Sequence, residues 1–340
     1  MLVSAGSPPP ATLDDLVPRA LRDRLDGLDV LSRRILSGKL PGERRSKRRG
    51  QSVEFDDYRQ YIPGDDLRHV DWNVYARFDR FVLKMFREEE DLAVHILVDG
   101  SASMCSGEGV GGGAGAASKL VFAHRLGMAL AYLGLVAQNR VEVSVVGSGL
   151  GPRRPGGVVT VGALRGRGAV ARASAFLLAS LAQPLEARTA SGADLNEAMR
   201  TIALSRAARG VMVVVSDFLA PGGVTRGLNF LAGGTTYGSA AGRYDSHCIQ
   251  VLSRGELDPA SQTDAGLVGD LRLQDAETGR WLDVTLTRPA VAAYKRRLEA
   301  YLERLERECL ARSMAYLRVT NDEDVGSLLL GTLRRRGLVG

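Results

Sequence analysis

The sequence predicts an α/β protein with a doubly wound, mostly parallel sheet, preceded by a small N-terminal subdomain. Two observations carry this prediction. From Leu92 onward, short apolar runs alternate with segments whose apolar residues recur at helical spacing. The runs Leu92–Val98 and Val211–Val215 are apolar throughout, as strands are when helices cover both faces of their sheet. The length of 340 residues and the 45% content of hydrophobic residues allow a core of that size.

Residues 1–50 are expected to form a disordered and helical segment that ends in a basic linker. Small residues and consecutive prolines dominate Met1–Ala11, which favours disorder. Leu13–Leu36 carries leucines at helical spacing and predicts one or two helices. The stretch Gly42–Gly50 is basic and bounded by glycines, which is typical of a linker.

Residues 51–91 are rich in aromatic side chains and are expected to form a subdomain of their own. We predict one helix and one strand here, over Leu67–Ala76 and Phe81–Phe86. Asp65 or Asp66 would cap the helix, because a short carboxylate accepts hydrogen bonds from the first free backbone N–H groups. The strand would lead into the following domain.

Residues 92–340 are expected to form one α/β domain with a hairpin inserted near 269–286. The predicted strands are Leu92–Val98, Val141–Val146, Val158–Val161, Val211–Val215, His247–Leu252 and Ala315–Val319. The predicted helices are Ser118–Gln138, Val170–Ala182, Leu195–Ser205, one that begins at Leu228, Ala290–Leu310 and Val325–Arg336. Asp275–Gly279 separates two short apolar segments and is a hairpin signal. We expect the glycine-rich stretch Gly107–Ala117 to be a mobile loop.

Composition narrows the compartment and the partners. Three scattered cysteines without close spacing are typical of a reducing compartment, and no apolar run reaches the roughly 18 residues of a membrane span. We therefore expect a cytoplasmic protein that does not bind membranes. The net charge is +6, and the run Arg44–Arg49 leaves nucleic-acid binding open as an alternative function. No aromatic residues are interleaved with that run, which favours a screened linker instead.

The residues that carry chemistry follow two of the predicted strands. Asp99, Ser101 and Ser103 form a D-x-S-x-S sequence directly after one buried strand, and Asp217 follows another. If the two strands are neighbours in a parallel sheet, both carboxylates face one crevice at their carboxyl ends. Carboxylate and hydroxyl oxygens are ligands for Mg²⁺ or another hard divalent cation. The alternative is that these residues form Asx and Ser/Thr turns that stabilise the strand end.

This set resembles the metal-ion-dependent adhesion site of von Willebrand factor A domains. The resemblance implies that type of sheet over Leu92 to the C-terminus, and a cation that recruits an acidic group from a partner protein. The family also supplies a threonine ligand, and here Ala193 stands at that position. Asp194, Ser191 and Thr189 lie close to it in sequence, and either hydroxyl could substitute.

A second resemblance covers residues from about Arg44 to the C-terminus. Its motif consists of Tyr61, Pro63, Gly64, Asp65, Asp66, Arg68, Asp71, Trp72 and Arg77. The motif resembles the signature of the domain-of-unknown-function family 58, in which it precedes a von Willebrand factor A-like domain. Within the signature, charged residues could simply pair with one another while Trp72 and Tyr61 fill a small core, or the segment could dock a partner.

Members of that family are often encoded beside MoxR-type AAA+ ATPases. The resemblance therefore implies a non-catalytic adaptor or co-chaperone whose partner is such an ATPase or its client. A metal-dependent hydrolase is a weaker alternative, because Ser101 and Ser103 lack the G-x-S-x-G setting of a nucleophile.

Overall fold

The computed structural model describes residues 10–32, 55–62, 70–86, 92–105, 117–151, 154–205, 210–220, 222–233, 244–259, 269–274 and 281–340. The chain divides into two compact units. The larger contains residues 1–38 and 92–340, and the smaller contains residues 39–91. The basic run Arg44–Arg49, the signature residues Pro63, Gly64, Asp65, Asp66 and Arg68, nearly all of the glycine-rich stretch Gly107–Ala117, and the turn Asp275–Gly279 lie outside the described residues.

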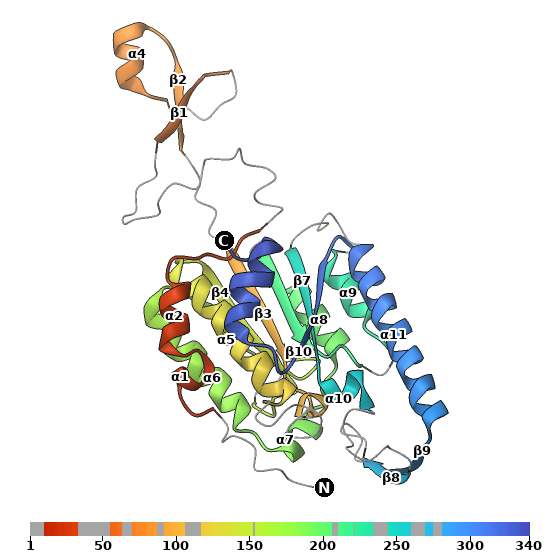
Figure 1. Ribbon diagram of the computed structural model, residues 1–340. Coiled ribbons are helices and arrows are strands. Elements are labelled where there is room, and N and C mark those ends of the chain that lie inside the picture. The colour runs from red at the N-terminus through yellow and green to blue at the C-terminus, as the bar shows by residue number, and fades with distance from the viewer. Residues whose placement is uncertain are drawn as a thin grey trace. The chain divides into compact units, whose positions relative to one another are not determined.

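The larger unit is built on one six-stranded sheet (Figure 1). Its strands are β3 (Ala93–Asp99), β4 (Arg140–Val146), β5 (Val158–Leu164), β6 (Gly210–Ser216), β7 (Tyr244–Leu252) and β10 (Ala315–Thr320). They are ordered β10-β7-β6-β3-β4-β5, and every neighbouring pair is parallel except β4 and β5. The mostly parallel sheet predicted from the alternation of strands and helices is therefore confirmed. Strand order reverses between β3 and β6, the switch point at which such sheets place their ligands.

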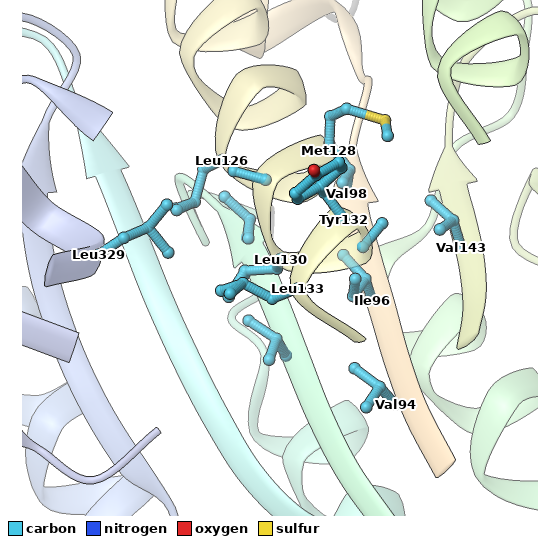
Figure 2. Packing of buried hydrophobic residues seen from close by; sticks show 14 of the residues in the cluster. Val94, Ile96, Val98, Leu126, Met128, Leu130, Tyr132, Leu133, Val143 and Leu329 are labelled. Atoms are coloured by element: carbon cyan, nitrogen blue, oxygen red, sulfur yellow. The ribbon is translucent and has the colours of Figure 1, made fainter. Parts of the chain in front are cut away.

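One face of the sheet is covered by α5 (Lys119–Val136) and α6 (Val170–Leu181). Leu126, Leu130 and Leu133 of α5 lie in one core cluster with Ile96 and Val98 of β3, and Figure 2 shows Leu126 on the side of Leu329. Two glycines let this helix lie close to the sheet, because a Cβ atom at Gly127 would meet Val98 at 2.7 Å and one at Gly134 would meet Val141 at 2.8 Å. The N-terminus of α5 is thereby held at the carboxyl end of the sheet.

The N-terminal helices α1 (Leu13–Leu16) and α2 (Arg19–Leu25) pack on the same side. Leu16, Val17 and Leu25 are fully buried in the core that α5 and α6 form with the sheet. Burial of each such side chain contributes about 2 kcal/mol, so these short helices are held by packing and not by their own length.

The opposite face is covered by α8 (Leu195–Leu204), α9 (Thr225–Leu231) and α11 (Arg288–Leu310). Further short elements connect the layers: η2 (Ala102–Cys105), η3 (Arg167–Ala169), α7 (Leu185–Thr189), α10 (Arg254–Leu257), α12 (Val325–Ser327) and the π-helical turns η5 (Leu328–Leu333). The predicted closing helix over Val325–Arg336 is thus present, and its middle widens into π turns that bury Leu328, Leu329 and Leu333. The predicted hairpin is confirmed, with β8 (Gly269–Gln274) antiparallel to β9 (Trp281–Leu286).

The smaller unit contains β1 (Phe55–Gln60), α4 (Trp72–Phe78) and β2 (Val82–Phe86). β2 pairs antiparallel with β1, so it does not lead into the central sheet as we expected. The helix predicted over Leu67–Ala76 begins later, at Trp72. Asp71 caps it, because its carboxylate accepts hydrogen bonds from the N–H groups of Asn73 and Val74.

Within the described residues, α5 is the one helix long and apolar enough to cross a membrane. Of its residues, 89% are buried inside the protein, which is typical of the central helix of a folded core.

Candidate functional site

The two site carboxylates emerge from neighbouring strands. β3 ends at Asp99, β6 ends at Ser216, and Asp217 follows directly. The strands pair in parallel, with Val98 opposite Val215. The two strands are therefore neighbours, which was the condition for both carboxylates to face one crevice. In Figure 1 the helices α7 and α10 lie at the end of the sheet to which β3 runs.

Asp99 is buried and held by hydrogen bonds from Ser101 and Ser216. Its Oδ1 atom accepts from the backbone N–H of Ser101 at 2.9 Å, and its Oδ2 atom accepts from the hydroxyl of Ser216 at 2.6 Å. Burial, and then the nearby charge of Asp217, raise the pKa of Asp99 to about 6. A cation close to this carboxylate would stabilise its charged form.

The serine hydroxyls of the D-x-S-x-S sequence converge. Ser101 Oγ and Ser103 Oγ lie 3.1 Å apart, where the chain turns into η2. Gly100 lets the turn lie close to the next strand: its N–H donates to Val146 O at 2.8 Å, and a Cβ atom there would lie 2.9 Å from the same oxygen. Gly100 therefore permits the tight turn after Asp99 that carries both hydroxyls, and a larger residue at position 100 would disturb this turn.

Asp217 is paired with a buried lysine. Its Oδ2 atom accepts from Lys119 Nζ at 2.9 Å, and its Oδ1 atom accepts from the backbone N–H of Leu219 at 3.0 Å. Lys119 is the first residue of α5, is fully buried, and also donates to Glu256 Oε1 at 2.5 Å. Burial acts to lower the pKa of Lys119, but the two carboxylates outweigh it and the pKa is raised. The ammonium group is therefore charged inside the protein.

Glu256 and Asp217 are fixed by their own neighbours. Glu256 lies in α10, where its Oε2 atom accepts from the N–H of Ser253 at 2.8 Å in a capping box. The backbone carbonyl of Asp217 accepts from Gln250 Nε2 at 2.7 Å, and Gln250 Oε1 accepts from the hydroxyl of Tyr316 at 2.5 Å. These bonds orient both carboxylates toward the lysine.

A second buried cation, Arg188, interacts with Asp99. The guanidinium of Arg188, in α7, donates to Gly100 O at 2.7 Å and also to Ser180 O. Burial lowers the pKa of Arg188, while Cys105 and Asp99 act in the opposite direction. Arg188 thus ties α7 to the turn that carries Ser101.

Comparison with known proteins assigns the family. The profile of a family described as "Protein of unknown function DUF58" matches residues 57–303. The chain belongs to this family. Uncharacterized proteins of Mycobacterium tuberculosis and Mycobacterium bovis are 26% identical to it over 272 residues, which is 80% of this chain and 76% of theirs. No solved structure gives a significant match.

Two of the three additional candidates are engaged elsewhere in this DUF58 protein. Thr189 is exposed, and its hydroxyl donates to Leu185 O at 3.1 Å. Asp194 is also exposed and caps α8 through the N–H groups of Asn196 and Glu197. The structure does not bring either side chain to the two strand ends.

Unlike Thr189 and Asp194, Ser191 and Ala193 lie on a loop beside the D-x-S-x-S turn. Ser191 is buried, and its hydroxyl has no hydrogen-bond partner in the described part of the chain. A Cβ atom at Gly147 would lie 2.9 Å from Ala193 Cβ and 3.0 Å from Ser101 Cα. Ala193 and Ser101 are therefore neighbours, and the loop that carries Ser191 and Ala193 borders the D-x-S-x-S turn.

The described signature residues of the DUF58 family lie in the smaller unit. Asp71 is buried and accepts from the hydroxyl of Tyr58 at 3.0 Å, besides capping α4. Trp72 is 57% exposed and packs edge-on against Tyr75 and Phe81, while Tyr61 contacts Phe81. These rings form a small aromatic cluster in which Trp72 and Phe81 remain exposed within the described residues. Arg77 lies in the last turn of α4.

Sequence reasoning missed the charged neighbours of the site, which are Lys119, Glu256 and Arg188, and the neutral hydroxyl of Ser216. One signal was available for Lys119, because it is a single lysine at the start of a helix that is otherwise almost entirely apolar. Within the described residues, no three His, Cys, Asp or Glu side chains cluster as metal ligands would. The site instead combines carboxylates with hydroxyls and buried cations.

Proposed function

We propose that this DUF58 protein is a non-catalytic adaptor or co-chaperone that binds a partner protein through a divalent cation, Mg²⁺, at the carboxyl ends of β3 and β6. Asp99, Ser101 and Ser103 would hold the cation, and Asp217 would be a further ligand. An acidic side chain of the partner would complete the coordination. The single observation that carries the proposal is the convergence of these four side chains at the switch point of the sheet.

The oxygen atoms of the site fit a small hard cation. Adjacent ligands of an octahedral Mg²⁺ ion lie about 3.0 Å apart, since each bond is about 2.1 Å long. Ser101 Oγ and Ser103 Oγ, at 3.1 Å, match that spacing. The buried hydroxyl of Ser191 supports a polar ligand in this region, because a buried polar atom without a hydrogen bond is costly.

Charge favours an acidic partner. Asp99, Asp217 and Glu256 are three carboxylates, and Lys119 and Arg188 are two cations, so the five groups leave one net negative charge. A divalent cation would convert this to one net positive charge. One acidic side chain of the partner would then neutralise the cluster, and a buried cluster is most stable when its charges balance.

The fold and the partner class follow from the same proposal. Counted along the chain, the strand order is 3-2-1-4-5-6 with an antiparallel third strand at the edge. That order supports a sheet of the von Willebrand factor A type. The family resemblance supports a MoxR-type AAA+ ATPase, or its client, as the partner in the cytoplasm.

The test is partner capture from the native lysate with the purified chain, in Mg²⁺ and in EDTA, with bound proteins identified by mass spectrometry. We expect an AAA+ ATPase or its client to be retained in Mg²⁺ alone. Asp99→Ala should abolish capture, whereas Asp194→Ala, which removes an exposed capping carboxylate, should not.

Undiminished capture by a folded Asp99→Ala variant would contradict the proposal. Binding that ignores EDTA but falls steeply with salt, together with retained nucleic acid, would instead favour the alternative based on Arg44–Arg49.

A further inference from the structure

Lys119 already supplies a positive charge at one of the carboxylates that a metal would need. Its ammonium group lies 2.9 Å from Asp217 Oδ2 and is sealed from solvent. If a divalent cation also bound Asp217, it and the ammonium group would compete for one carboxylate. The two cations would then lie a few ångströms apart, where their repulsion is strong.

We propose that Lys119 is a tethered competitor of the metal: it closes the site by occupying Asp217 and opens it by pairing with Glu256 alone. The inference rests on the proposed function, because it states how cation binding at the same site is controlled. It assigns to Lys119 and Glu256 a role in setting metal affinity that differs from that of the ligands.

Glu256 is what makes this exchange possible. It lies 2.5 Å from Lys119 Nζ through Oε1, and its other oxygen is held by Ser253. A lysine that leaves Asp217 therefore keeps one carboxylate and is not left as an unpaired buried charge, which would be far more costly. Both carboxylates come from segments distant from Lys119 in sequence, 98 and 137 residues away.

The remaining contacts of Asp217 also support the exchange. Among the described residues, its Oδ1 atom accepts from the backbone N–H of Leu219, and its main-chain carbonyl is held by Gln250. The loop position of Asp217 is thus maintained by bonds that do not involve Lys119. Loss of the lysine contact would free a carboxylate oxygen in place, as a metal ligand requires.

The competition makes the site selective by charge. A divalent cation offers Asp217 twice the charge of the ammonium group, whereas Na⁺ or K⁺ offers no more charge than the lysine. Divalent cations are therefore the class that can displace Lys119, and monovalent cations are not.

The experiment measures Mg²⁺ affinity by calorimetry for the full chain and three variants. Lys119→Met keeps the length of the side chain without its charge, and should bind Mg²⁺ at least tenfold more tightly than the natural chain. Glu256→Gln leaves the lysine with Asp217 as its charged partner among the described residues, and should bind at least tenfold more weakly. Lys295→Met, which removes an exposed lysine paired with Asp258, is the matched control and should change nothing.

Thermal unfolding with and without Mg²⁺ gives a second readout, and Lys119→Met should gain more stability from the metal than the natural chain does. Equal or weaker Mg²⁺ binding by Lys119→Met would overturn the inference. If that variant does not fold, Glu256→Gln decides: unchanged affinity overturns the inference, and weakened affinity supports it.

The outcomes separate the inference from the proposed function. Tight Mg²⁺ binding by Lys119→Met with none by the natural chain would keep the inference and overturn metal-dependent partner binding. Equal tight binding by all four proteins, with partner capture in Mg²⁺ alone, would overturn the inference and keep the function. Absence of binding by every variant overturns both.

Discussion

The hydroxyl of Ser216, the last residue of β6, donates a 2.6 Å hydrogen bond to Asp99 Oδ2 at the end of β3. Ser216, which directly precedes the site carboxylate Asp217, therefore holds the other site carboxylate, Asp99. Ser216 Oγ also accepts from the backbone N–H of Phe218 at 2.9 Å, so one hydroxyl joins two strand ends and the following loop. This small polar link aligns Asp99 with the loop that carries Asp217.

Ser216→Ala should lower the free energy of unfolding by about 2 kcal/mol, because a buried hydrogen bond to a charged group is lost. Chemical denaturation near neutral pH measures the change. Ser174→Ala, which removes a buried hydroxyl bound to a neutral carbonyl of Ala171, is the control and should cost about 1 kcal/mol or less. Equal losses of unfolding free energy for the two variants would show that the bond to Asp99 contributes no more than a bond to a neutral carbonyl.

Ala193→Thr should tighten Mg²⁺ binding, because it adds a hydroxyl on the loop beside Ser101. A tethered ligand replaces a free water at a smaller entropy cost, so the affinity should rise several-fold. Calorimetry measures this, and Ala171→Thr, on the exposed side of α6, is the control. A folded Ala193→Thr variant with unchanged affinity would mean that residue 193 does not face the cation.

Gly147→Ala should destabilise the protein by about 2 kcal/mol, since its φ angle is +67° and the added Cβ atom would press on Ala193 and on the backbone of Ser101. Thermal and chemical unfolding test this. Gly168→Ala has open space around it and should be close to neutral. A neutral Gly147→Ala would mean that the two loops at the strand ends are not packed against each other.

Stability should also depend on the protonation of His124, which is fully buried. Its Nδ1 atom donates to Leu120 O at 2.8 Å and its Nε2 atom accepts from Ser180 Oγ at 3.0 Å. Burial lowers the pKa of His124 to about 3, below the ordinary value of 6.5. The unfolded chain therefore binds the proton first, so stability is full above pH 6.5 and is lost as the pH falls toward 3.

Between pH 6.5 and 4.5 this loss should be about 2–3 kcal/mol. Asp99 acts in the opposite direction, because its pKa is raised to about 6 and its protonation stabilises the fold as the pH falls. The measurement is therefore the difference in pH dependence between the natural chain and His124→Gln, which does not titrate. Parallel stability curves for the two proteins would rule out His124 as the cause.

The start of α4 in the smaller unit shows how much of a helix the local sequence pattern predicts. The sequence predicts a helix here from spacing alone, but its first residue depends on which carboxylate reaches the free N–H groups. Asp71 does so, and its second oxygen accepts from Tyr58. Several aspartates precede the helix, and sequence spacing does not distinguish among possible caps without the position of β1.

The sequence alone determines the alternation of strands and helices, and with it the six-stranded, mostly parallel sheet. The reason is physical: apolar runs with no polar face must be covered on both sides, and parallel strands bring their carboxyl ends to one edge. The same reasoning brings Asp99 and Asp217 to one edge of the sheet, and the pairing of β3 with β6 makes their strands neighbours.

Only the tertiary structure decides which charges surround those carboxylates. Lys119, Glu256 and Arg188 lie far from Asp99 and Asp217 along the chain, and no periodicity marks them as partners. A buried ion needs opposite charges or hydrogen bonds within a few ångströms, so its partners are chosen by how the helices pack on the sheet. The close approach of α5, permitted by Gly127 and Gly134, is what carries the lysine into the site.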